Sequence, residues 1–145
     1  MKISKQGLNL LKLNEGLKLS AYLDTENYWT IGFGNRYING RQVIEGDKIS
    51  EQQAFDLLYD HLEKHVYPFI SAIKIPLTQY QFDALCSFIY NIGGSAFSKS
   101  TMLKLLNQNN IEGAKLEFMR WTKQKELTAR RCREKQMFEG KVWKK

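Results

Sequence analysis

The chain of 145 residues contains little proline, cysteine or histidine, with two of each. The scarcity of proline, together with 43% hydrophobic and 12% aromatic residues, argues against a disordered segment. Apolar runs extend over only a few residues, whereas a helix that crosses a bilayer needs about 20, so we expect no membrane-spanning segment. The basic N-terminus lacks an apolar stretch and a small-residue cleavage site, which argues against a signal peptide. These absences predict a globular protein made in a cytoplasm.

The cysteines and histidines show no spacing typical of a metal site. Cys86 lies in an apolar helical run and Cys132 lies among arginines, without CxxC or Cys/His spacing. We interpret both as structural residues, with a disulfide between them as an alternative. His61 and His65 are four residues apart on a predicted helix, but no third ligand accompanies them. We therefore expect surface or half-buried histidines and no metal.

Positive charge is concentrated near the C-terminus. The formal net charge is +7, and residues 120–145 hold 10 lysines and arginines against 3 acidic residues, which accounts for the whole excess. A basic face predicts an anionic partner, which can be nucleic acid, an anionic membrane or an acidic polymer. Charge alone does not choose among these three.

The patterns of apolar and turn residues predict an α+β protein. A short helix is expected over residues 4–14, ended by Gly16. Between about 17 and 49, β-branched and aromatic residues alternate with turn residues, and Asn39-Gly40 predicts a type I′ hairpin. We predict a single domain over 1–145, with this β-subdomain, a helical lobe over about 50–145 and a ligand cleft between the two.

Capping and periodicity divide the helical lobe into five predicted helices. Ser50 and Gln53 form a capping box that opens a helix running toward Pro68, and Thr78 and Gln81 form a second one. The second helix is expected to end at Gly93-Gly94. Ser98 or Ser100 begins the third helix, and the last two are predicted over residues 111–121 and 128–139.

Glu15, Asp24 and Thr30 form a candidate constellation, at intervals of 9 and 6 residues. Hydrolysis of a glycosidic bond needs a protonated carboxyl and an ionised carboxylate, and a hydroxyl can help to hold the attacking water. The end of the predicted helix should raise the pKa of Glu15, while a polar turn should keep Asp24 ionised. The same residue types are also common at helix ends, turns and strands, and the local pattern alone favours that structural interpretation.

Longer motifs resemble the phage-type lysozymes, the endolysin muramidases of glycoside hydrolase family 24. Glu15-Gly16, Tyr22-x-Asp24 and Thr30-Ile31-Gly32-x-Gly34 keep the intervals of that family's catalytic signature. Three further regions resemble its central helices and its C-terminal basic motif: residues 76–85, 88–93 with Ser100-Thr101, and Leu127-x-x-Arg130-Arg131-x-x-Glu134. Two positions depart from the family, with Asn27 where glycine is usual and Asn35 where histidine is frequent.

The resemblance implies hydrolysis of the β-1,4 bond between N-acetylmuramic acid and N-acetylglucosamine in peptidoglycan. It implies Glu15 as general acid, Asp24 as the carboxylate that activates or orients water, and Thr30 as the water-holding hydroxyl, without a cofactor. Substrate-binding roles are implied for Tyr90, Asn91 and Ser100. Arg130 or Arg131 would lower the pKa of Glu15 if it lay nearby, and a solvated helix face is the alternative for this arginine pair.

The resemblance also implies a monomer that acts on a peptidoglycan glycan strand, without nucleic acid or stable membrane insertion. It implies accumulation in the host cytoplasm and passage to the wall through a phage pore, the holin. Three alternatives stay open at this point. One is a nucleic-acid-binding module that uses Arg130, Arg131 and Arg133, another a wall-binding or membrane-perturbing protein, and the third a transglycosylase that cleaves the same bond without water.

Overall fold

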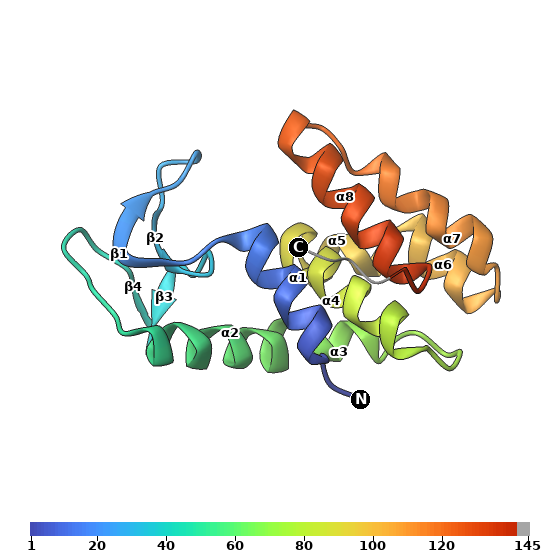
Figure 1. The fold of residues 1–145 in the computed structure, drawn as a ribbon, viewed down its shortest axis with the longest axis horizontal. Coiled ribbons are helices and arrows are strands. Elements are labelled where there is room, and N and C mark those ends of the chain that lie inside the picture. Colours follow the sequence, from blue (N-terminus) through green and yellow to red (C-terminus); the bar gives the residue numbers. More distant parts are fainter. Residues whose placement is uncertain (142–145) are drawn as a thin grey trace. The chain divides into compact units, whose positions relative to one another are not determined.

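The computed structural model describes residues 1–141. It divides into two compact units, one of Met1–Asn14 with the residues from Lys64 onward, and one of Glu15–Glu63. Figure 1 labels the helices and strands of both units along the chain. None of the helices within residues 1–141 is long and apolar enough to cross a bilayer.

The unit Glu15–Glu63 holds all four strands of the described chain. Strands β1 (Lys18–Leu23) and β2 (Trp29–Gly32) pair antiparallel, and Tyr22 lies opposite Thr30. Strands β3 (Tyr37–Ile38) and β4 (Arg41–Gln42) form a hairpin. Its two turn residues, Asn39 and Gly40, have φ of 50° and 84°, which confirms the predicted type I′ turn.

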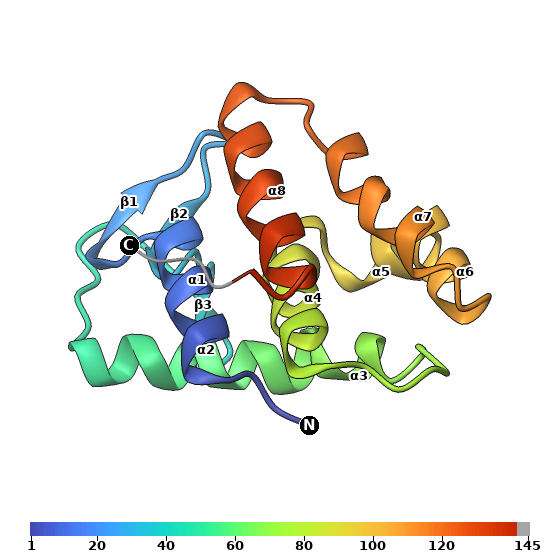
Figure 2. The same cartoon turned by 45° about the vertical axis from the view of Figure 1, so that its right-hand side comes forward.

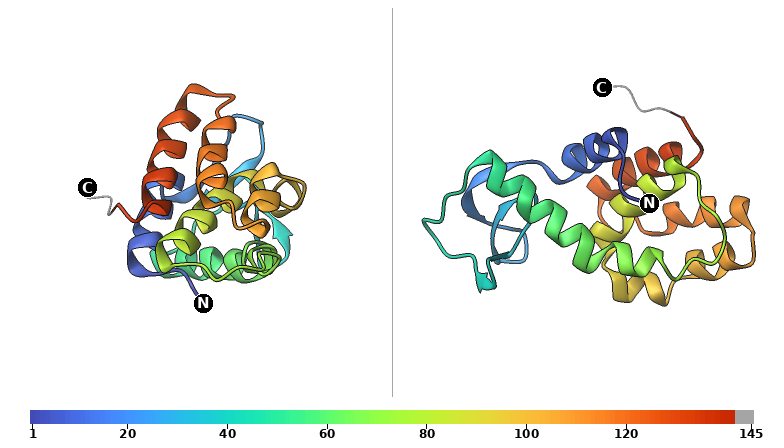
Figure 3. Two further views of the ribbon diagram at one scale, coloured as in Figure 1. Left: turned by 90° about the vertical axis from the view of Figure 1, so that its right-hand side faces the viewer. Right: turned by 90° about the horizontal axis from the view of Figure 1, so that it is seen from below.

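Helix α2 (Glu51–His65) begins in the strand-containing unit and continues into the residues from Lys64 onward. The Gln53 amide N–H donates to Ser50 Oγ at 3.1 Å, and the Ser50 N–H donates to Gln53 Oε1 at 2.8 Å, so the predicted capping box is confirmed. The right-hand view of Figure 3 shows α2, in green, as one uninterrupted helix. Its apolar face is buried at Ala54, Leu58 and Leu62.

The other unit is helical throughout its described residues. It contains α1 (Lys5–Glu15, of which Glu15 belongs to the strand-containing unit), α3 (Tyr67–Ile70), α4 (Gln79–Ile92), α5 (Gly94–Ser98), α6 (Thr101–Asn107), α7 (Ile111–Glu117), a 3₁₀ turn (Phe118–Arg120) and α8 (Lys125–Phe138). Helices α4 and α8 lie side by side, as do α6 and α7 (Figure 2). Phe88 of α4 lies at the centre of the aromatic core, with ring centroids 5.1 Å from Phe118 and 5.8 Å from Trp121.

The observed helix boundaries match the predicted ones where a capping side chain marks the start of a helix. Other observed boundaries differ from the predicted ones. Ser4 Oγ accepts the Gly7 N–H at 3.1 Å at the start of α1, and the capping box of Thr78 opens α4 as predicted. Three differences concern the later helices. Helix α5 was not predicted, the helix from Ile111 changes to a 3₁₀ turn at Phe118, and α8 begins at Lys125 rather than at residue 128.

Candidate active site

Asp24 is fixed in the turn between β1 and β2 by backbone donors. Its Oδ1 accepts the N–H groups of Glu26 and Tyr28, both at 2.9 Å. These bonds, with the Tyr28 contribution the largest, lower the pKa of Asp24 below its ordinary value, and Arg36 lowers it further. Asn27, one of the two positions at which the sequence departs from the motif of the resembled family, takes a left-handed backbone in this turn, with φ of 65°. The turn therefore keeps Asp24 ionised, as predicted.

Arg36 is a neighbour of Asp24 that the sequence interpretation missed. Its Nη2 lies 2.9 Å from Asp24 Oδ2 and 3.3 Å from Glu26 Oε2. The guanidinium carbon lies 4.0 Å from the centroid of the Tyr28 ring. Twelve residues separate Arg36 from Asp24, and no motif links the two positions, so only the folded loop reveals the pair.

Thr30 lies in β2 and is almost completely buried, with 2% of its surface exposed. Its hydroxyl donates to the Tyr28 carbonyl at 2.9 Å. That bond uses the hydroxyl proton and leaves the oxygen as an acceptor. Thr30 is thus held by the same turn that holds Asp24.

Tyr22 interacts electrostatically with the carboxyl groups of both Glu15 and Asp24. Burial raises the pKa of its phenol, and the nearby carboxylates of Glu15 and Asp24 raise it further. Tyr22 also faces Thr30 across the β1–β2 pair. Tyr22, a motif residue for which the sequence indicates no role, is thus a common neighbour of all three predicted site residues.

Glu15 is the last residue of α1 and is half-buried. Its Oε1 would lie 3.1 Å from a Cβ added at Gly34, a residue with φ of 86°. Glycine at this position therefore serves both the backbone conformation and the close approach of the carboxyl group. The Gly-x-Gly motif places a loop directly against the candidate acid.

Asn35 follows this loop and is buried, with 8% of its surface exposed. Its backbone N–H and C=O both bond to Ile31, each at 2.8 Å. Within residues 1–141, no group donates a hydrogen bond to its side-chain oxygen. Asn35 thus closes the turn after β2 through its main chain.

The predicted substrate-binding residues Tyr90, Asn91 and Ser100 belong to the helical unit. Ser100 is the N-cap of α6, since its Oγ accepts the Leu103 N–H at 3.1 Å and donates to the Phe97 carbonyl at 2.6 Å. The side-chain oxygen of Asn91 accepts a hydrogen bond from Arg131. Tyr90 is half-buried on α4. Ser100 and Asn91 thus have structural partners, and their substrate-binding role stays a prediction.

The arginine pair on α8 does not form a solvated face, so that interpretation is wrong. Arg130 and Arg131 are 5% and 1% exposed, and Glu134 between them is fully buried. Arg130 Nε lies 3.1 Å from Glu134 Oε2, and Arg131 Nη1 lies 2.5 Å from Glu134 Oε1. Ser87 of α4 donates to Glu134 Oε2 at 2.5 Å. The two guanidinium groups therefore tie α8 to α4 in the core.

The nucleic-acid alternative places Arg130, Arg131 and Arg133 together on an exposed face. Arg130 and Arg131 are buried, and Arg133 donates from Nε to Asn14 Oδ1 at 3.0 Å. These three arginines therefore do not form such a face.

The described residues hold no cluster of three or more His, Cys, Asp or Glu side chains able to bind a metal ion. Cys86 is buried and Cys132 exposed, and both are free thiols, so the alternative of a disulfide between them is wrong. Burial raises the pKa of the Cys86 thiol well above its ordinary value, and the nearby Asp83 raises it further, which suits a small core residue.

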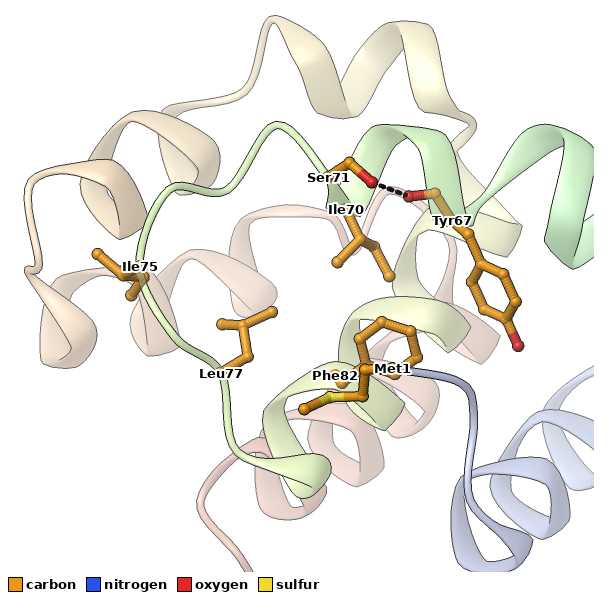
Figure 4. A pocket seen from close by; sticks show the side chains of 7 residues that line it. All are labelled: Met1, Tyr67, Ile70, Ser71, Ile75, Leu77 and Phe82. Atoms are coloured by element: carbon orange, nitrogen blue, oxygen red, sulfur yellow. Dashed lines mark hydrogen bonds between the residues drawn. The ribbon is translucent and has the colours of Figure 1, made fainter.

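A cavity of about 230 Å³ lies in the helical unit, and none of the candidate catalytic residues lines it. Figure 4 shows its lining, which is mostly apolar: Met1, Tyr67, Ile70, Ser71, Ile75, Leu77 and Phe82. The Ser71 hydroxyl donates to the Tyr67 carbonyl at 3.2 Å. None of the seven lining residues is an aspartate, glutamate, histidine, lysine, arginine or cysteine, and the lining holds no pair of carboxyl groups.

Comparisons with known proteins agree with one another. Residues 12–134 match the family model described as phage lysozyme. The chain is 40% identical to an endolysin of Acyrthosiphon pisum secondary endosymbiont phage 1, over 97% of this chain and 99% of the relative. It is 39% identical to an endolysin of Salmonella phage P22, over 95% and 98% of the two chains. The solved structure of an endolysin from Escherichia coli O157:H7 phage FAHEc1 is 37% identical and superposes with a TM-score of 0.90, over 100% of this chain and 98% of that one. This likeness confirms the predicted lysozyme-like α+β fold.

Proposed function

Because the chain belongs to the phage lysozyme family and is a lysozyme-type glycosidase, we propose that it hydrolyses the β-1,4 bond between N-acetylmuramic acid and N-acetylglucosamine in peptidoglycan. Hydrolysis of this bond in the host wall lyses the cell. The residues proposed to carry the reaction are Glu15, Asp24 and Thr30.

Glu15 acts as the general acid and gives its proton to the leaving glycosidic oxygen. Asp24 stays ionised through the reaction, because its backbone donors and Arg36 lower its pKa. An ionised carboxylate can stabilise the positive charge that develops on the sugar ring, and with Thr30 it positions and activates the attacking water. The lowered pKa makes Asp24 a weak base, so positioning and charge stabilisation are its larger contributions.

The observation that carries this proposal is the arrangement of Asp24 in the β1–β2 turn. Two of its acceptor positions are filled by backbone N–H groups and one by Arg36, while a carboxylate offers about four. The side chain remains 20% exposed. One acceptor position is thus left for a water molecule at a carboxylate whose orientation is fixed.

The partner in this proposal is a glycan strand of peptidoglycan, bound by a monomer with no nucleic acid and no stable membrane insertion. Peptidoglycan carries carboxylates, which the net charge of +7 would attract. The protein is made in the host cytoplasm and reaches the wall through a phage pore. Tyr90, Asn91 and Ser100 contact the glycan.

The proposal is tested by the clearing of Gram-negative cells whose outer membrane has been permeabilised. Glu15→Gln and Asp24→Asn should each abolish most of the clearing that the wild type produces. Glu45→Gln is the matched control, since it removes one exposed negative charge from the same unit and should clear at the wild-type rate. Wild-type clearing by the Glu15→Gln protein would refute the role of Glu15 and favour a wall-binding or membrane-perturbing action.

A further inference from the structure

Arg36 contacts three side chains of the turn that holds Asp24, namely those of Asp24, Glu26 and Tyr28. Its Nη2 is shared between Asp24 Oδ2 at 2.9 Å and Glu26 Oε2 at 3.3 Å. The guanidinium group stacks over the Tyr28 ring at 4.0 Å. The main chain of Arg36 is anchored as well, because its carbonyl accepts the Val43 N–H at 2.9 Å.

We propose that Arg36 is a positioning residue of the reaction, which fixes the plane of the Asp24 carboxylate and holds the turn over residues 24–28 in its active shape. The inference rests on the proposed function of Asp24. It assigns to this chain a residue that neither the motif nor the comparisons identify.

The need for Arg36 follows from how the two carboxylate oxygens are held. The Glu26 and Tyr28 N–H groups both bond to Oδ1, whereas Arg36 bonds to Oδ2. Rotation about the Cβ–Cγ bond moves both oxygens together, and the energy well of this sp³–sp² torsion is broad, so donors on one oxygen leave a range of carboxylate orientations. The bond from Arg36 to the second oxygen narrows this range. The free acceptor position on the carboxylate then points in one direction.

The stack on Tyr28 explains how an exposed arginine can act as an anchor. Arg36 is 40% exposed, and a flexible side chain at such a site contributes little unless its geometry is restricted. The planar guanidinium group is restricted on one face by the Tyr28 ring and at its edge by two carboxylates. Lysine would keep the charge but would lose the planar contact.

Among residues 1–141, the ionisable groups that interact with Asp24 are Arg36, which also pairs with Glu26, and Tyr22 on β1, whose pKa is raised by both Asp24 and Glu15. Because the positive charge of Arg36 favours the ionised form of Asp24, removal of Arg36 should raise the pH at which Asp24 gains a proton. Activity should then be lost at a higher pH on the acid side of the profile.

The test compares Arg36→Met with Arg41→Met, a matched control in the same unit. Arg41 also pairs with an aspartate, since Nη1 and Nη2 lie 2.9 Å and 3.1 Å from the two oxygens of Asp47. Its hydrogen bonds go to Asp47 and to the Gln42 carbonyl, which are not among the proposed catalytic groups. Rates of reducing-end release from purified peptidoglycan are measured between pH 3 and pH 8, with the unfolding midpoint of each variant. Arg36→Met should lower kcat between about tenfold and about a hundredfold with a smaller change in KM, since displaced catalytic groups cost this much. The acid limb, the pH at which activity falls on the acid side of the profile, should move upward in Arg36→Met. Arg41→Met should change neither kcat nor this pH.

Arg36→Lys separates charge from geometry and carries the test if Arg36→Met does not fold. It should restore the acid limb while leaving kcat below that of the wild type. Wild-type kcat and acid limb in Arg36→Met, or equal losses in Arg36→Met and Arg41→Met, would overturn the inference. Asp24→Asn is assayed alongside: if it stays active, the proposed function of Asp24 fails, whereas an inactive Asp24→Asn with a fully active Arg36→Met refutes the inference about Arg36 alone.

Discussion

Replacing Glu134 with glutamine should destabilise the protein by about 3 to 5 kcal/mol, the usual cost of leaving buried charges without their partner. Glu134 is fully buried and accepts hydrogen bonds from Ser87, Arg130 and Arg131. Glutamine has nearly the same shape, so the substitution creates no cavity. It removes the negative charge of Glu134, which pairs with both buried guanidinium groups, and turns an oxygen acceptor into an NH₂ donor that faces them.

The expected change in the unfolding midpoint follows from the size of the protein. Unfolding entropy is about 2.1 cal/mol/K per residue, or about 0.3 kcal/mol/K for a chain of 145 residues. A loss of about 3 to 5 kcal/mol therefore lowers Tm by about 10 to 16 °C. Such a decrease is easily resolved by circular dichroism at 222 nm or by calorimetry.

Glu112→Gln is the matched control for this experiment. Glu112 is 82% exposed and lies 2.8 Å from Lys115 on the surface of α7, so its loss should cost less than about 1 kcal/mol and about 3 °C. If Glu134→Gln also shifted Tm by less than about 3 °C, the buried network would not be the link between α4 and α8 that the structure indicates.

Three further predictions concern the strand-containing unit. Gly34→Ala and Gly40→Ala both place a side chain at a positive φ, of 86° and 84°, so both should lower stability by a similar amount. Only Gly34→Ala should also lower activity, by about tenfold, because its added Cβ meets the Glu15 side chain. Equal activities of the two variants would contradict this contact. Asn27 has a φ of 65°, which a β-branched residue adopts only with strain, so Asn27→Val should lower Tm by about 3 to 6 °C. Asn27→Gly should not lower Tm, and thermal unfolding measures both variants. The pKa of Asp47 is lowered by Arg41 from its ordinary value of 3.8, so this pair should stabilise the fold above about pH 4 and lose that effect as pH falls through the lower folded value. The Tm difference between wild type and Asp47→Asn should accordingly vanish in acid, and a difference that persists there would refute this linkage.

Features that depend on neighbouring residues were predictable from the sequence. The capping boxes at Ser50 and Thr78 and the turn at Asn39-Gly40 use hydrogen bonds and backbone conformations that span at most four residues. The pattern of Glu15, Asp24 and Thr30 was visible for the same reason, since it lies within one short segment. Its chemical interpretation came from the resemblance to a family rather than from the local pattern.

Features that depend on distant residues were not predictable. Helix α5 begins at Gly94, directly after Gly93, and Gly94 lies so close to the ring of Phe69 that an added Cβ would come within 2.1 Å of Cε2. The sequence shows only two glycines, which usually end a helix. The burial of Arg131 likewise depends on Asn91, which lies 40 residues earlier in the chain.

The role of Glu15 as proton donor in the hydrolysis of the β-1,4 bond is tested by analysis of the digestion products. Purified peptidoglycan is digested with the wild type and with Glu15→Gln, and the released fragments are separated and identified by mass. We expect fragments that end in reducing N-acetylmuramic acid from the wild type and almost none from Glu15→Gln. Anhydro-muramic acid ends would instead identify a transglycosylase, and reducing ends released at the wild-type rate by Glu15→Gln would contradict the role of this residue.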